Sequence, residues 1–113
     1  MGAQEVSVKG SEANLLAQVK EAVRRAAPNA DVILFGSRAR GNARPDSDYD
    51  LLVLTDQPVS LALEEKIREQ VYPIEFDTGA VLTLLAYSKA DWASPRCQAM
   101  PLHAHVQRDG VRL

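Results

Sequence analysis

Two short apolar runs, at residues 32–35 and 51–54, bracket a polar segment rich in glycine, arginine and aspartate. Apolar runs of this length, bounded by turn-forming residues, are typical of strands that are buried on both faces. The two predicted strands are Asp31–Phe35 and Tyr49–Thr55. The connection between them is short, so we expect them to pair antiparallel or to lie next to each other. The chain must then carry its polar segment at one end of a small sheet.

The first half of the polar segment reads Gly36-Ser37-Arg38-Ala39-Arg40-Gly41. We interpret it as a tight turn followed by a short helical piece. Such a turn offers backbone N–H groups, the Ser37 hydroxyl and the positive end of the helical piece, and this combination suits a phosphate group.

The second half brings two acids to the start of the second strand, Asp48 and Asp50. Successive side chains of a strand alternate between faces, so these two carboxylates point to the same side. Neighbouring carboxylates repel each other unless a positive charge lies between them, and a divalent metal with oxygen ligands is the usual solution. The segment therefore predicts a phosphate site and a metal site on adjacent pieces of chain.

These residues resemble the signature of the DNA polymerase β-type nucleotidyltransferases. The pattern consists of Gly36-Ser37-x-Ala39-Arg40-Gly41 followed by Ser47-Asp48-x-Asp50-Leu51, with an apolar strand on each side. The chain is similar to the minimal nucleotidyltransferases, which are often encoded beside a HEPN-domain partner. The resemblance runs from the first predicted helix to about Tyr87.

The resemblance implies transfer of a nucleoside monophosphate, with ATP as the expected donor, to a protein or small-molecule acceptor. It implies two Mg²⁺ ions bridged by Asp48 and Asp50, and phosphates held by Gly36 and Ser37. Arg38 or Arg40 would add positive charge near the leaving pyrophosphate, although Arg40 has an alternative role in tying down the turn. The implied partner is a HEPN-domain protein or a second copy of the chain, and the implied role is antitoxin-like.

A third carboxylate is normally found in this family on the next strand, and here the pattern leaves two alternatives. Asp77 is one candidate for that ligand, with Glu75 on the same face if the segment is extended. Aligning the strand by its end at Tyr87 instead places the expected acid near Leu82 or Thr83, neither of which is anionic. In that case the third acid is missing, and the chain would bind nucleotide and act by binding its partner.

The remaining pattern predicts a single α+β domain over residues 11–113, after a loose arm over residues 1–10. We expect helices at residues 11–26, 60–71 and 98–108, with Pro73 ending the second, and a further short helix after Ser88. Residues 74–87 read as extended, with the third strand proper at 81–86. The fold class is a small nucleotidyltransferase fold: a short mixed sheet of about three to four strands with helices mainly on one face.

Composition narrows the functional classes. A chain of 113 residues with 46% hydrophobic content fits one domain with one modest core. Its net charge of −2 argues against a general nucleic-acid-binding surface. The single cysteine, Cys97, fits a reducing cytoplasm, and neither a membrane-spanning run nor a secretory signal is evident.

Overall fold

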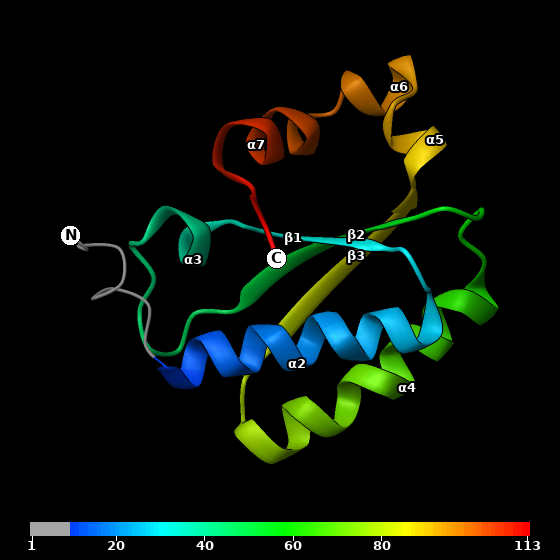
Figure 1. The fold of residues 1–113 in the computed structure, drawn as a ribbon. Helices are drawn as coiled ribbons and strands as arrows, with labels where there is room; N and C mark the ends of the chain where they lie inside the picture. The colour runs from blue at the N-terminus through cyan, green and yellow to red at the C-terminus, as the bar shows by residue number, and fades with distance from the viewer. Residues whose placement is uncertain (1–9) are drawn as a thin grey trace.

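The computed structural model describes residues 10–113, with side chains from residue 12 onward (Figure 1). The predicted N-terminal arm therefore lies almost wholly outside the described residues. The elements in chain order are α2 (Gly10–Ala26), β1 (Asp31–Phe35), α3 (Ser37–Arg40), β2 (Tyr49–Thr55), α4 (Leu61–Thr78), β3 (Leu82–Ser88), α5 (Lys89–Trp92), α6 (Pro95–Gln98), α7 (Pro101–Asp109) and β4 (Val111–Arg112).

The strands form one four-stranded mixed sheet in the order β3-β2-β1-β4. Strand β1 pairs antiparallel with both β2 and β4, whereas β2 pairs parallel with β3. A parallel pair needs a crossover, and α4 supplies it. The predicted α+β class with a short mixed sheet is confirmed, as is the antiparallel pairing of the first two strands. The edge strand β4 was not individually predicted.

The two faces of the sheet are covered differently. The closed face, which carries Val32, Leu34, Leu51 and Val53, packs against the long helices α2 and α4 in one continuous core. The half-covered face, which carries Ile33, Phe35, Leu52 and Leu54, packs against Trp92, Val106 and the other apolar residues of α5–α7. Figure 1 shows α2 and α4 together on one side of the sheet and the short helices on the other.

Helix α4 runs through Pro73, so the prediction that this proline ends the helix is wrong. Proline removes one helical hydrogen bond and crowds the preceding turn. The last turn persists because Ile74 is buried in the core and because the Thr78 hydroxyl donates to the Ile74 carbonyl at 2.6 Å. The helix ends at Gly79, whose φ of 76° is the left-handed conformation that glycine adopts freely. Residues 74–78 are therefore helical rather than extended.

The C-terminal segment contains two helices where one was predicted over residues 98–108. Ser94 caps the first, α6, by accepting a hydrogen bond from the Cys97 N–H. Pro101 starts the second, α7, because its missing N–H and fixed φ suit the first helical position. A proline thus begins each of these two helices.

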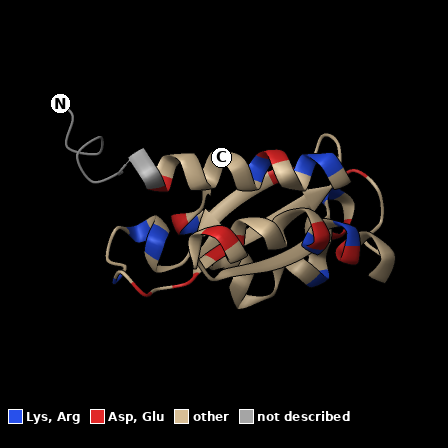
Figure 2. Ribbon diagram, turned by 90° about the horizontal axis from the view of Figure 1, so that it is seen from below, with Lys and Arg blue, Asp and Glu red and all other residues tan. Residues whose placement is uncertain are grey.

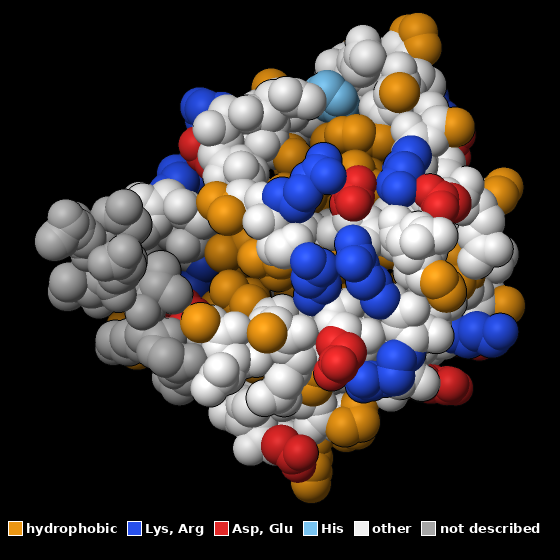
Figure 3. Space-filling view, in the orientation of Figure 1, with side chains coloured by type: hydrophobic (Ala, Val, Ile, Leu, Met, Phe, Trp, Pro, Cys, Tyr) orange, Lys and Arg blue, Asp and Glu red, His pale blue; other side chains and the backbone are white. Residues whose placement is uncertain are grey.

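Several surface charges are paired. Ion pairs join Arg25 to Glu21, Lys89 to Asp56 and Arg112 to Asp31. Figure 3 shows basic side chains with acidic ones among them, beside a hollow lined by apolar side chains. A cavity of about 490 Å³ lies there, between α2, α3 and β4. Over the described residues, no helix is both long and apolar enough to cross a membrane.

Candidate active site

Gly36 forms the bend between β1 and α3. Its φ of 76° and ψ of −160° lie in a region that is essentially restricted to glycine. Its carbonyl accepts hydrogen bonds from the N–H groups of Ala39 and Arg40, each at 3.1 Å. A Cβ placed on Gly36 would overlap the carboxylate of Asp50. The glycine therefore serves both the bend and the close approach of an acid.

Ser37 is the first residue of α3, directly after this bend. The N–H groups of Ser37 and Arg38 belong to the first helical turn, where no intrahelical acceptor is available. Both residues are partly exposed, so these donors lie near the surface. The predicted tight turn and short helical piece thus lie at the predicted place, beside Asp50, and phosphate binding there stays a prediction.

Asp48 and Asp50 lie together at the start of β2. Asp50 is paired across the sheet with Phe35 of β1 and with Thr83 of β3. Burial raises the pKa of the Asp50 carboxyl, and the nearby Asp48 charge raises it further, whereas Arg40 lowers it. An acid whose ionised form is disfavoured by burial and by a neighbouring carboxylate, next to a glycine that leaves room for it, forms an arrangement suited to a divalent cation.

The structure does not bring Asp77 to these two acids. Asp77 lies exposed in the last turn of α4, which covers the closed face. Glu75, the other candidate, accepts a hydrogen bond from the Leu82 N–H at 2.9 Å and so fixes the start of β3. Within the described part of the chain, no three His, Cys, Asp or Glu residues are grouped to hold a metal. The prediction that the segment carrying Asp77 is extended is wrong, because the helix continues past Pro73 to Thr78.

The guanidinium of Arg38 is committed to the protein. It donates to the carbonyl oxygens of Pro45 and Ser47 and to the Glu12 carboxylate, and it stacks on the Tyr49 ring with its Cζ 4.2 Å from the ring centroid. Its side chain is only 14% exposed. Arg38 therefore has a structural role, because it anchors the loop before β2.

Arg40, unlike Arg38, interacts with Asp109 and Asp50. Its guanidinium lies 3.6 Å from the Asp109 carboxylate, and its side chain remains 42% exposed. Its charge also acts on Asp50. Figure 2 shows the basic residues of α3 and the acidic residues of the following loop at the same end of the sheet.

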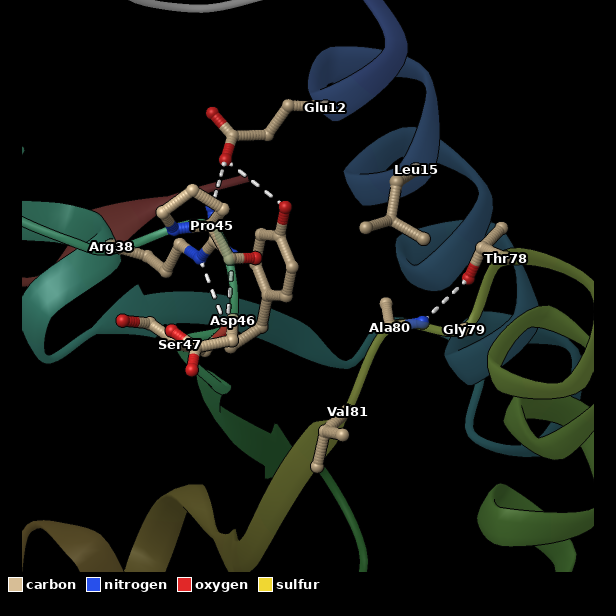
Figure 4. Close-up of a pocket in the computed structure, with 11 residues that line it drawn as sticks. Glu12, Leu15, Arg38, Pro45, Asp46, Ser47, Thr78, Gly79, Ala80 and Val81 are labelled. Atoms are coloured by element: carbon tan, nitrogen blue, oxygen red, sulfur yellow. Dashed lines mark hydrogen bonds and ion pairs between the residues drawn. The ribbon is translucent and has the colours of Figure 1, made fainter.

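A cavity of about 540 Å³ lies on the other side of this loop. Figure 4 shows Glu12, Arg38 and loop residues at one end, with Thr78 and Val81 opposite. Glu12 accepts hydrogen bonds from Arg38 and from the Tyr49 hydroxyl, each at 3.1 Å. Burial, the Glu12 hydrogen bond and the Glu12 charge together raise the pKa of Tyr49. Neither Asp48 nor Asp50 lines this cavity, because Tyr49 alternates with them.

The contact between Glu12 and Arg38 was missed by sequence reasoning. The two residues are 26 positions apart, and neither belongs to a spacing pattern that would connect them. Only the packing of α2 against the sheet brings them together.

The chain also matches a known protein family. A model of the nucleotidyltransferase domain matches residues 16–92, which is more than half of the chain. The chain belongs to the nucleotidyltransferase domain family. The matched region includes the Gly36 bend, Asp48, Asp50 and all of β3.

A curated relative of this nucleotidyltransferase domain is the probable protein adenylyltransferase MntA of Haemophilus influenzae (strain ATCC 51907 / DSM 11121 / KW20 / Rd). The two are 31% identical over 65 residues, which is 58% of this chain and 54% of the relative. The chain thus matches about half the length of that relative.

Solved structures share the fold of this nucleotidyltransferase domain. A structure described as a minimal nucleotidyltransferase is 28% identical, with a TM-score of 0.58 over 89% of this chain and 90% of its own. A toxin–antitoxin structure with AMP-PNP has a TM-score of 0.60 at 18% identity, over 85% of this chain and 69% of its own. Spectinomycin adenyltransferase AAD(9) from Enterococcus faecialis has a TM-score of 0.57 at 22% identity, over 72% and 36%. The last two likenesses concern the fold alone.

Proposed function

We propose that this domain transfers AMP from ATP to a protein or small-molecule acceptor in a Mg²⁺-dependent reaction, in an antitoxin-like role beside a HEPN-type partner. The observation that carries the proposal is the placement of the Asp50 carboxylate against the Gly36 bend, with Asp48 close enough for its charge to act on Asp50. The similarity to a probable protein adenylyltransferase favours AMP and a protein acceptor. Use of ATP and the free thiol of Cys97 fit action in the cytoplasm.

Each residue has a distinct task in this proposal. Asp48 and Asp50 would hold Mg²⁺, which when bound neutralises phosphate charge and orients the reacting oxygens. Ser37 and the N–H groups of the bend would hold the terminal phosphates. Arg40 would face the leaving group, because Arg38 is engaged with the loop.

The reaction is a substitution at the α-phosphorus of ATP. An acceptor hydroxyl oxygen forms a bond to that phosphorus, the bond to the bridging oxygen of the pyrophosphate breaks, and the hydroxyl proton passes to solvent or to a nearby base. The protein contributes mainly position and charge to such a reaction.

The test is label transfer from ATP carrying a radioactive α-phosphate, with Mg²⁺, to the chain itself and to a HEPN-domain partner. We expect wild type to transfer label, and Asp48→Ala to lower the rate by about a hundredfold or more. Asp46→Ala is the matched control, because Asp46 is an exposed acid two residues away and should leave the rate unchanged. Absence of label transfer by the wild type would remove the enzyme claim.

A second candidate is a nucleotide-binding subunit that neutralises its partner by contact. The observation that favours it is the separation of Asp77 and Glu75 from the acid pair. The Asp48→Ala/Asp50→Ala double variant distinguishes the two candidates. Partner neutralisation that survives the double substitution supports binding, whereas its loss together with label transfer supports catalysis.

A further inference from the structure

We infer that the acid pair of this chain holds one divalent cation rather than two, and that Thr83 occupies the position from which a third carboxylate would hold the second. This inference rests on the proposed function and concerns the metal content of the same site. It replaces the two-ion site implied by family resemblance with a site specific to this chain.

The sheet register identifies Thr83. Strands β2 and β3 run parallel, with Asp50 opposite Thr83. Paired residues on adjacent strands project from the same face, and the strands lie about 4.8 Å apart. Thr83 is exposed, and it follows Leu82, whose side chain belongs to the closed-face core. Thr83 is therefore the neighbour of Asp50 on β3 that shares its face and reaches solvent.

The neighbour of Asp50 on β1 cannot supply a third metal ligand either. On β1 the paired residue is Phe35, whose side chain packs with the apolar cluster of the half-covered face. Asp50 thus lies between an aromatic residue and a threonine.

Glu75, Asp77 and Asp109 are three further acids that do not complete this site. Glu75 binds the Leu82 N–H, and Asp77 lies on the helix that covers the opposite face. Asp109 lies 3.6 Å from Arg40 and 3.0 Å from Arg108, so its charge is already matched by two arginines. Arg40 lies on α3, directly after the Gly36 bend, and its half-exposed guanidinium adds positive charge at this end of the sheet, which disfavours a second cation there.

The number of carboxylates at the site also favours one ion. Two divalent ions held about 4 Å apart, as in two-metal sites, carry four positive charges. The protein supplies only two carboxylates to such a pair, so the nucleotide's phosphates would have to provide most of the remaining charge and oxygen ligands. One divalent ion, in contrast, is balanced by the two carboxylates and can complete its oxygen shell with water and phosphate.

The experiment measures Mn²⁺ as a spectroscopic substitute for Mg²⁺, bound to the full chain with AMP-PNP, by electron paramagnetic resonance and equilibrium dialysis. The variants are Thr83→Asp and Thr83→Glu, which add the carboxylate at two lengths, and Thr83→Asn, which matches the shape without charge. Ala62→Glu is the charge control, because Ala62 is exposed on α4 over the closed face.

We expect about one Mn²⁺ per nucleotide-bound chain in wild type, Thr83→Asn and Ala62→Glu, and about two in Thr83→Asp or Thr83→Glu, with spin coupling between the ions. We also expect label transfer to rise by roughly tenfold or more in the acidic variant that gains the ion. Two ions in the wild type would overturn the inference while leaving the proposed function intact. A single ion in both acidic variants would also overturn it. Failure of AMP-PNP to bind at all would instead remove the proposed function, and the inference with it.

Discussion

The two faces of β2 have different roles, although both are formed by the same seven residues. On the closed face, Leu51 and Val53 have no exposed surface and contribute to a core continuous with α2 and α4. On the half-covered face, Leu52 and Leu54 are buried, but the packing ends before Asp50. Alternation along a strand thus lets one short segment supply stability on one side and acids on the other.

Truncating the core measures the difference between the faces most directly. Leu51→Ala should lower the free energy of unfolding by about 2–5 kcal/mol, because it leaves a cavity in the closed-face core. Leu85→Ala, on the partly buried side of β3, should cost about 1–2 kcal/mol, because its surroundings are more exposed. Urea unfolding followed by circular dichroism provides both values. Equal losses would show that the two faces are packed alike.

Gly36→Ala tests whether glycine is needed at the bend to leave room for Asp50 or only to allow the backbone conformation. We expect a loss of about 1–3 kcal/mol in unfolding free energy from the strained φ. We also expect AMP-PNP affinity to fall by about tenfold or more, because the new methyl group displaces Asp50.

Gly41→Ala is the matched control for Gly36→Ala. Gly41 has a φ of 80°, yet nothing lies within 4 Å of a Cβ placed there. This variant should lose about 1 kcal/mol of stability and keep its nucleotide affinity. Equal affinity losses in the two variants would mean that the bend acts through backbone strain alone.

Arg38→Lys tests whether the two faces are coupled through the loop before β2. Lysine keeps the charge but loses the fork that reaches Pro45, Ser47 and Glu12, so we expect a loss of about 1–2 kcal/mol in stability. Hydrogen exchange of residues 45–48 should become faster, and AMP-PNP should bind several-fold more weakly, about 2- to 5-fold. Arg44→Lys is the control, because the Arg44 side chain is exposed. Unchanged hydrogen exchange of residues 45–48 in Arg38→Lys would show that Arg38 does not couple the two faces of the sheet.

The sequence was sufficient for the parts of the site that depend on local chemistry. The Gly36 bend, the pair Asp48 and Asp50, and the two flanking strands all follow from residue type and spacing over some twenty positions. The mixed sheet follows from the short connection between β1 and β2 and the helix between β2 and β3.

What the sequence could not settle depends on contacts between distant segments. Burial of Ile74 keeps α4 helical beyond Pro73, against the local preference of proline. The two alternatives for the third acid, Asp77 or a position near Thr83, could not be separated without the β2–β3 register. Likewise, the engagement of Arg38 with Glu12 depends on how α2 packs, so spacing alone could not assign the two arginines.

The smallest expected change in stability, that of Asp50→Asn, is the most specific test of the half-covered face. Because burial and Asp48 raise the pKa of Asp50, its ionised form costs folding free energy at neutral pH. Asp50→Asn should therefore abolish label transfer while raising stability at pH 7 by up to about 0.5 kcal/mol.

The sign of the pH dependence follows from the raised pKa. As pH falls through the folded-state pKa of Asp50 toward the ordinary value of about 4, wild type takes up the proton and its penalty disappears. The stability advantage of Asp50→Asn should therefore shrink on acidification, as measured by urea unfolding at a series of pH values. An advantage that grows toward low pH, or a loss of stability at pH 7, would contradict this. Adding Mg²⁺ and AMP-PNP at pH 7 should reverse the order, because ligand stabilises wild type and not the variant.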